Sequence, residues 1–375
     1  MLKQQISYGN LQQLCKINMG GNAMRGQIYW GAFTCFLILL LAATCPSEAK
    51  TSVVNLMINA DMPLSATEEQ KKMAESNLFD LYNAINGKNL TATIFSTQDF
   101  IDSHARLRLT DIGRSSSFEL AMSGNHSGEK LSHQSLEGQK AILETSKKYV
   151  GGCRVCGENE IIATGFMPQS FDQNENTYKA LDELAIAYDA GFQAGILYAP
   201  GHEKDVWPYK VANHNFYAVP VSTQELSGKK MPLVDSYAKD KGLSSSSWYD
   251  LMKAKFDDAQ GKEEPVVISL STSISGTGDY LAALKQFLDY SISNDARFVT
   301  TMGLVNMSRP VGSETTAMPI TNNESETVIS SNATLKEEVS SGCSACDAKK
   351  EAGMNATAGN ETVSIVLDVG GNKTE

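Results

Sequence analysis

The stretch SVVNLMINADMPLSATEE, residues 52–69, decides the fold of this chain. Residues 52–60 are an apolar run of strand length, and Ser65 and Glu68 have the spacing of a capping box that opens a helix. Apolar side chains then recur at helical spacing until Gly87, at Ala74, Leu78, Leu81 and Ile85. The stretch therefore predicts a strand followed by a helix.

The same order of strand and helix recurs along the chain. Further strands are predicted at residues 91–96, 117–124, 161–164, 194–198, 216–221, 266–271 and 298–301. Helices are predicted at residues 135–150, 175–188, 246–259 and 278–293. About seven β-then-α units predict an α/β protein with a parallel (β/α) barrel. An open, doubly wound sheet is the alternative, but residues 61–64 contain no glycine for a phosphate-binding loop after the first strand.

The composition excludes two classes of protein. The chain has 375 residues, 42% hydrophobic and 20% charged, so it can bury a sizeable core and is not disordered or fibrous throughout. It carries 32 Lys and Arg against 43 Asp and Glu, a net charge of −11, and so it repels phosphate backbones. Nucleic acid is not an expected partner.

The globular part of the chain is expected at residues 50–305, because no aromatic residue lies beyond Phe298. Residues 306–375 are rich in Ser, Thr, Asn and Glu and are expected to be a disordered tail, or a small β-unit around residues 361–369. Either a glycosylated stalk or chance explains the Asn-x-Ser/Thr acceptors of this tail, which are Asn306, Asn323, Asn332, Asn355, Asn360 and Asn372.

The first 49 residues read as an export segment. Residues 28–45 carry no charge and follow Arg25, which is typical of a signal peptide or an N-terminal membrane anchor. Cleavage is predicted before Lys50, and Met24 would start a signal peptide of ordinary length, so residues 1–23 are a possible mis-assigned start. Both interpretations predict a secreted or cell-surface protein, held to a membrane if the segment is retained.

Two cysteine pairs lie beyond the predicted cleavage point. They are Cys153 with Cys156 and Cys343 with Cys346. In an exported protein such pairs form disulfides, and the alternatives are a structural zinc site or a redox-active pair.

Three segments carry a resemblance to a known family. They are GNHS at residues 124–127, FMPQSFDQNENT at residues 166–177, and EEPVVISLSTSISG at residues 263–276. In content and order they are similar to the polysaccharide deacetylases of the NodB-homology group, also named carbohydrate esterase family four, across about residues 52–305. This resemblance implies a distorted (β/α) barrel with its site at the carboxyl ends of the strands.

The resemblance also implies a chemistry and a partner. Members of the family remove acetyl groups from sugar polymers, with one Asp and two His on a divalent metal such as zinc, a second Asp as base and a His as acid. On this sequence the metal Asp falls at Asp61 and the first metal His at His126. A cell-envelope polysaccharide is therefore the expected partner.

Several positions depart from the family pattern. The base falls at Ala60, the acid at Ser271 and the second metal His at Lys130, while the Arg that orients the base falls at Phe166 and a family glycine at Ser170. A methyl group cannot take up a proton, and a serine hydroxyl does not donate one as an imidazolium does.

Two hypotheses address the lost metal ligand. Glu129 or His133 could supply a third donor beside Asp61 and His126. In the other hypothesis the Lys130 ammonium replaces the metal and lies within hydrogen-bond reach of Asp61, unless Lys130 simply points to solvent.

Two functions of different class follow. The chain is either a deacetylase-fold surface protein that binds glycan without hydrolysis, or a divergent, active metal-dependent deacetylase. Sugar rings could stack on aromatic side chains, unless these only pack in the barrel; the candidates are Trp207, Tyr209, Phe216 and Tyr217. The remaining histidines, His104, His202 and His214, are expected at the surface of loops.

Overall fold

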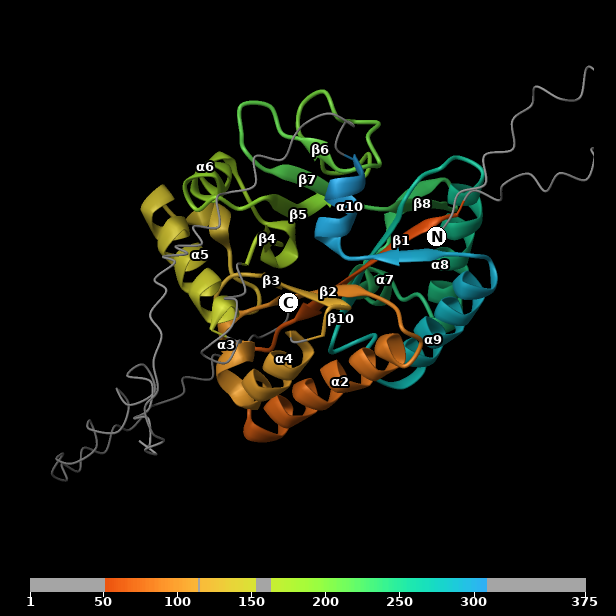
Figure 1. Cartoon of the computed structure of the whole chain (residues 1–375), viewed down its shortest axis with the longest axis horizontal. Helices are drawn as coiled ribbons and strands as arrows, with labels where there is room; N and C mark the ends of the chain where they lie inside the picture. Colours follow the sequence, from red (N-terminus) through yellow and green to blue (C-terminus); the bar gives the residue numbers. More distant parts are fainter. Residues whose placement is uncertain (1–50, 114, 153–162, 309–375) are drawn as a thin grey trace, which may run out of the picture.

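The computed structural model describes residues 51–113, 115–152 and 163–308 (Figure 1). The strands are β1 (Val53–Ala60), β2 (Ala92–Ser96), β3 (Phe118–Met122), β4 (Gly165–Phe166), β5 (Tyr188–Gln193), β6 (Tyr209–Lys210), β7 (Tyr217–Val221), β8 (Thr223–Leu226), β9 (Lys229–Pro232), β10 (Val266–Ser271) and β11 (Arg297–Val299). The helices are α2 (Glu68–Asn86), α3 (Gln98–Phe100), η2 (Ile101–Ala105), α4 (Arg106–Gly113), η3 (Leu131–His133), α5 (Leu136–Gly151), η4 (Gln169–Phe171), α6 (Glu175–Glu183), α7 (Asp235–Asp240), α8 (Ser245–Gln260), α9 (Gly278–Ser293) and α10 (Thr301–Ser308).

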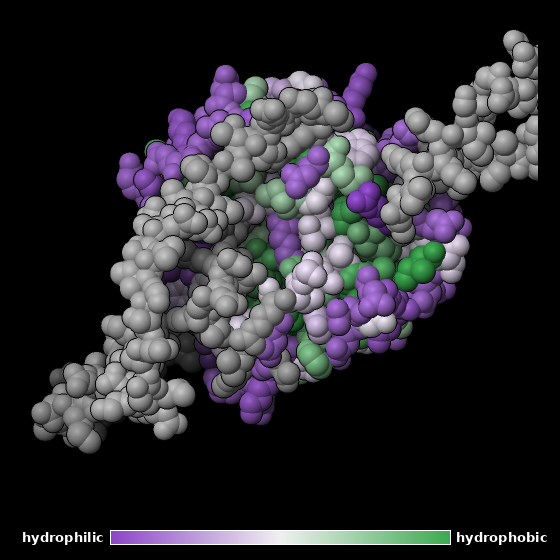
Figure 2. All heavy atoms as spheres, viewed as in Figure 1, coloured by the Kyte–Doolittle hydropathy of each residue, from purple (hydrophilic) through white to green (hydrophobic). Residues whose placement is uncertain are grey.

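Nine strands form one central sheet with the order β10-β1-β2-β3-β4-β5-β7-β6, and β11 pairs with β1. Its ladders are parallel except where β6 meets β7. Helices α2, α5, α6, α8 and α9 lie around the outside of this sheet (Figure 1). On the face shown in Figure 2, hydrophilic side chains gather along the outer rim and apolar ones lie nearer the centre. The predicted mixed α/β fold with a mostly parallel sheet is confirmed.

The two ends of the sheet are joined by backbone hydrogen bonds around Ser222. Its N–H donates to the Val267 carbonyl of β10 at 3.0 Å, and its carbonyl accepts from the Leu233 N–H at 2.8 Å. The Leu233 carbonyl in turn accepts from the Ser269 N–H of β10 at 2.9 Å. The segment after β7 thus links to β10, and the sheet closes on itself in the manner of a barrel.

Local sequence explains the principal elements. Helix α2 begins after Thr67, whose side chain forms a reciprocal capping box with Gln70, two residues later than the pair proposed from the sequence. Strand β1 is buried almost throughout, as expected for a central parallel strand. In β4, a Cβ on Gly165 would overlap the Tyr188 ring, so glycine is required where that ring crosses the strand.

A polar layer fills the amino-terminal end of the barrel. The Glu119 carboxylate of β3 accepts hydrogen bonds from Thr93 Oγ1 at 3.0 Å, from the Tyr188 hydroxyl at 2.7 Å and from the Met302 N–H at 2.9 Å. Asn55 donates from Nδ2 to the Val299 carbonyl at 3.0 Å, and the Thr301 N–H donates to Thr93 Oγ1 at 2.8 Å. These bonds fix the start of α10 under the strands.

Two sequence predictions around β5 are wrong. The helix predicted to residue 188 ends at Glu183, because the chain turns at Ala185, whose φ is 52°. The strand predicted at 194–198 is instead β5, Tyr188–Gln193. Residues 194–196 form a turn, and Leu197 makes an isolated antiparallel bridge with Gln193. The true strand contains Asp189 and Gly191, both weak strand formers, and tertiary pairing with β4 and β7 outweighs that preference.

Two strand boundaries also differ. Of the strand predicted at 161–164, residues 161–162 lie outside the described residues, and the strand there is the two-residue β4 at 165–166. The strand predicted at 298–301 is β11 at 297–299. Helix α10 follows β11 and extends to Ser308, past the boundary predicted at residue 305. Its buried Leu304 and Val305 show that the apolar pattern continues beyond the last aromatic residue.

Several predictions lie outside the described residues. They concern the segment 1–49, the tail from residue 309 and the cysteines Cys153, Cys156, Cys343 and Cys346. Within the part of the chain that is described, no helix is long and apolar enough to cross a membrane.

Candidate functional site: a hydroxyl-lined pocket with one carboxylate

A pocket of about 290 Å³ lies at the carboxyl ends of the strands. Its walls come from the ends of β1 and β10, from the loop after β4, and from the GNHS segment. The polar side chains that line it are Asn59, Asp61, Ser127, Gln169, Ser170, Ser236, Ser269, Ser271 and Ser273. This is the edge of a parallel barrel where functional side chains from different strands meet.

Asp61 is the one charged side chain among the described residues that line this pocket. It follows the last residue of β1, and its Oδ2 accepts a hydrogen bond from Ser127 Oγ at 3.3 Å. Burial raises the pKa of Asp61, and the Ser127 bond only partly offsets that effect.

Hydroxyl and amide groups form the opposite wall. Asn59 Nδ2 donates to Ser269 Oγ at 2.9 Å across the β1–β10 pair, and Ser271 Oγ lies 2.9 Å from Ser273 Oγ. A hydroxyl both donates and accepts, so this wall can bond a neutral polar ligand in either sense.

The loop after β4 has a strained backbone. Ser170 has φ of 54° and Phe171 has φ of 58°. This left-handed backbone conformation is unfavourable for residues that have a Cβ. The sequence placed a family glycine at Ser170, and the backbone keeps the conformation that glycine favours. Gln169 fixes the loop by donating from Nε2 to Ser123 Oγ at 2.8 Å. Strain retained beside a pocket is characteristic of functional sites.

Asp235 lies behind the wall that carries Ser271 and Ser273 and holds the backbone of that wall in place. Its side chain is buried, and its Oδ2 accepts from the Ser271 N–H at 2.7 Å and from the Ser275 N–H at 3.2 Å. Burial raises the pKa of Asp235 to about 7, although these hydrogen bonds oppose the rise. Asp235 therefore orients the turn that carries Ser271 and Ser273 without lining the pocket itself.

The GNHS segment forms a turn around Glu129. Gly124 has φ of 84°, and a Cβ there would collide with the Glu129 carboxylate. That carboxylate accepts from the Asn125 N–H at 2.8 Å, and its Oε1 lies 3.8 Å from His126 Nδ1. Glu129 is buried, which raises its pKa.

The predicted metal ligands are not brought together. Among the described residues, no group of three His, Cys, Asp or Glu side chains is placed to hold a metal ion. Asp61 bonds Ser127, His126 faces Glu129, and His133 is exposed. These residues, as they are arranged, therefore do not fit the Asp-and-two-His metal site that the resemblance implies.

Lys130 is not bonded to Asp61 either, so the predicted ammonium-for-metal exchange is wrong. Lys130 is exposed. Burial disfavours ionisation of Asp172, but hydrogen bonds from Ser132 and the charges of Lys130 and His133 outweigh it and lower the pKa of Asp172. The short helix η3 begins directly after Lys130. In this helix Ser132 donates to the Asp172 carboxylate from its N–H at 3.0 Å and from its hydroxyl at 2.7 Å, so the turn lies beside Asp172.

The predicted sugar-stacking rings do not line the pocket. Phe216 is fully buried, and Tyr209 is 8% exposed and stacks on His202 with ring centroids 3.9 Å apart. Trp207 Nε1 donates to the Glu263 carbonyl at 3.1 Å. Tyr217 is the first residue of β7, and the Lys210 ammonium lies over its ring, 5.4 Å from the centroid. Tyr217 pairs with the first residue of β5, whereas the Tyr209 hydroxyl accepts from the Ala199 N–H beyond the end of β5. None of the four rings is among the residues that line the pocket.

Two of the loop histidines are paired with carboxylates. His202 Nδ1 lies 2.6 Å from Asp205 Oδ2, and His214 Nδ1 lies 2.8 Å from Asp182 Oδ2. The side chain of His214 is only 9% exposed, so the expected surface position is wrong for this residue. The side chain of His104 lies outside the described part of the structure.

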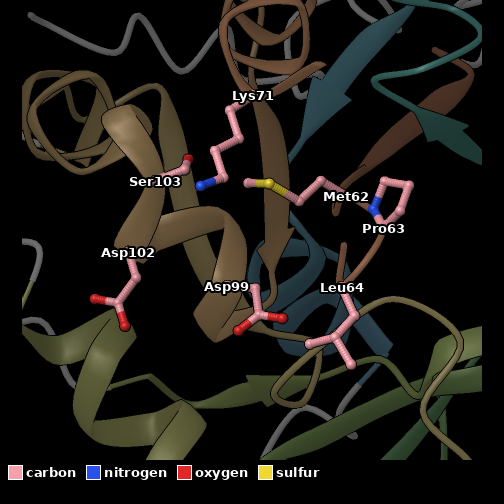
Figure 3. Close-up of a pocket in the computed structure, with 7 residues that line it drawn as sticks. All are labelled: Met62, Pro63, Leu64, Lys71, Asp99, Asp102 and Ser103. Carbon is pink, nitrogen blue, oxygen red and sulfur yellow. The ribbon is translucent and has the colours of Figure 1, made fainter. Parts of the chain in front are cut away.

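A second, smaller pocket of about 210 Å³ lies on the other side of the segment that follows β1 (Figure 3). Met62, Pro63 and Leu64 form its apolar side, Lys71 reaches into it from α2, and Asp99 contributes a carboxylate from α3. Lys71 is already paired with Glu68 at 2.7 Å.

Sequence reasoning missed Glu119, Asp189 and Asp235. Each is a lone acid among apolar neighbours in or beside a buried strand. A carboxylate in such a position must be paired or protonated, and that was the signal available in the sequence.

Comparison with solved structures agrees with this geometry. The chain resembles a protein of Mycobacterium smegmatis described as a polysaccharide deacetylase, with 16% identity, a TM-score of 0.54, and coverage of 70% of this chain and 91% of that one. The fold is that of the polysaccharide deacetylases. A protein of Pseudomonas aeruginosa PAO1 with the same description gives 14% identity, a TM-score of 0.50, and coverage of 68% and 89%.

The same fold also carries other chemistry. The PuuE allantoinase matches with 14% identity, a TM-score of 0.54, and coverage of 71% of this chain and 93% of that one. No protein-family profile and no curated protein sequence matches the chain. The deacetylase fold is therefore established here by structure, and the activity has to be argued from the site.

Proposed function

We propose that this chain is an exported, deacetylase-fold protein that binds cell-surface carbohydrate at the pocket beside Asp61 without hydrolysing it. The observation that carries the proposal is the pocket itself, which offers hydroxyl and amide groups for a polyol while Ala60 and Ser271 stand at the positions of the base and the acid. Export is supported by the uncharged run at residues 28–45.

The two positions of acid–base chemistry support binding over hydrolysis. Ala60 is fully buried at the end of β1 and presents only a methyl group. Ser271 is engaged with Ser273. General acid–base catalysis contributes about 10²–10⁴ in rate, so a site without either group loses much of the rate of a deacetylase.

The test measures binding and hydrolysis on the same preparation. Calorimetry or NMR titration with oligomers of a β-linked amino sugar is expected to show binding, while acetate release stays at the rate without protein. Ser273→Phe, which fills the pocket, is expected to abolish binding. Ser246→Phe is the control, because Ser246 is exposed on α8 away from the pocket.

The competing function is a divergent metal-dependent deacetylase that uses Asp61 and His126 with His133 or Glu129. Acetate release that requires one bound zinc ion, and that is lost in His126→Ala, would overturn the proposal in its favour. Absence of binding in the wild-type protein and in both Ser→Phe variants alike would also overturn it.

A further inference from the structure

The charge balance of the pocket points to a narrower class of ligand. Asp61 accepts one described side-chain hydrogen bond, the 3.3 Å contact from Ser127, and no cation among the described residues lines the pocket with it. The two basic side chains that the sequence placed nearby lie beside other carboxylates, His126 beside Glu129 and Lys130 beside Asp172. Among the described residues, the Asp61 carboxylate therefore has no counter-charge in the pocket.

A ligand can supply that counter-charge. An ammonium group forms charge-assisted hydrogen bonds with a carboxylate, and these are about twice as strong as neutral ones. An acetamido group at the same place would instead bring only a neutral N–H, together with a carbonyl oxygen that the carboxylate repels. A primary amine is therefore favoured over its acetylated form.

The remainder of the wall fits a hydroxylated ring. Ser236, Ser271 and Ser273 present hydroxyls, and Asn59 and Gln169 are held by bonds to Ser269 and Ser123. A volume of about 290 Å³ is at the small end of ligand cavities, which suits one sugar unit rather than several.

We infer that the pocket recognises a 2-amino sugar unit whose amine is free, with the ammonium on Asp61 and the ring hydroxyls on the serine wall. This inference rests on the proposed carbohydrate-binding function and deepens it. In a reaction sequence, such a protein binds the product of a deacetylation and not its substrate.

The experiment compares glucosamine oligomers with N-acetylglucosamine oligomers of equal length by calorimetry at neutral pH. The glucosamine oligomer is expected to bind about tenfold or more tightly, the increment of one charge-assisted hydrogen bond. Asp61→Asn is expected to remove this preference. Asp250→Asn, which changes the net charge equally at an exposed position on α8, is expected to retain it.

Each other outcome is decisive. Equal binding of the two oligomers overturns the inference and leaves the proposed function standing, whereas binding of neither overturns the proposed function. A lysine peptide that binds as tightly as the glucosamine oligomer shows that the site reads amines without sugars and overturns the inference. If Asp61→Asn does not fold, the comparison of the two oligomers on the wild-type protein decides alone, and a glucosamine oligomer that binds no more tightly than the acetylated one overturns the inference.

Discussion

Each end of the barrel holds a carboxylate, and the two carboxylates differ in how fully their hydrogen bonding is satisfied. At the amino-terminal end, Glu119 accepts hydrogen bonds from Thr93, Tyr188 and the Met302 N–H, at 2.7 to 3.0 Å. At the carboxyl end, Asp61 has the 3.3 Å bond from Ser127 and faces a pocket of about 290 Å³. Burial raises the pKa of both groups.

The difference separates a structural acid from a binding acid. Three donors with good geometry satisfy Glu119, so nothing remains for a ligand to supply. Asp61 has acceptor capacity left over and an opening through which a partner can enter. Under the proposed function, the carboxylate with acceptor capacity left over marks the end of the barrel at which a ligand is expected.

The largest effect is expected when the satisfied acid is removed. Glu119→Ala leaves the donors of Thr93, Tyr188 and Met302 without their acceptor, and the free energy of unfolding should fall by about 3 kcal/mol. Glu119→Gln keeps one acceptor oxygen and should cost clearly less. Urea unfolding of the two variants measures the difference.

Asp61→Asn provides the contrast for that experiment. Asp61 accepts the 3.3 Å bond from Ser127 and a bond from its own backbone N–H, and an asparagine oxygen can accept both, so the stability change should stay within about 1 kcal/mol. If Asp61→Asn loses as much stability as Glu119→Ala, Asp61 is as important to the fold as Glu119, and the contrast between a structural and a binding carboxylate is wrong.

A second prediction concerns how stability depends on pH behind the pocket. Burial raises the pKa of Asp235 to about 7, far above that of an unfolded aspartate. The folded state therefore binds this proton more tightly than the unfolded state, and the stabilisation is full below about pH 4 and is lost as the pH rises through about 7.

Asp235→Asn should remove that contribution. The stability of the variant minus that of wild type is expected to rise between pH 4 and pH 7 and to be flat above it, in urea unfolding at several pH values. Asp250→Asn serves as the exposed control. A difference that falls over this interval would contradict the raised pKa.

The smallest effect is expected in the strained loop of the pocket. Ser170→Gly relieves a left-handed φ of 54° and should raise the free energy of unfolding by about 0.5–1 kcal/mol. Ser246→Gly, in the first turn of α8, should lower it by a similar amount. Thermal unfolding of both variants gives the comparison, and destabilisation by Ser170→Gly would show that the Ser170 backbone is not under strain.

The sequence was informative where local patterns agree with the final contacts. Helices α2, α5, α8 and α9 were predicted within a few residues, because apolar spacing and capping residues act over a single turn. Strands β1 and β10 were also predicted, since they are apolar runs buried along nearly their whole length. Strand β5 was missed because its Asp189 and Gly191 are held by partners distant in sequence.

The candidate site was predicted in position but not in arrangement. Asp61 and Ser271 were correctly assigned to the carboxyl ends of two neighbouring strands. The third metal donor and the Lys130–Asp61 bond depended on how one turn folds. Gly124 and Glu129 determine that turn, through a close approach that no residue spacing encodes.

The polar layer at the amino-terminal end also has a consequence for how the protein forms during synthesis. Asn55 donates to the Val299 carbonyl, 244 residues further along the chain, and Glu119 takes one of its three donors from Met302. Until the ribosome has released that last stretch, Asn55 lacks this acceptor and Glu119 has only the donors of Thr93 and Tyr188. Contacts this distant in sequence form slowly. The domain can therefore complete its fold only after nearly all of it has been translated, and a chain that stops before α10 would expose this layer to aggregation or to chaperones.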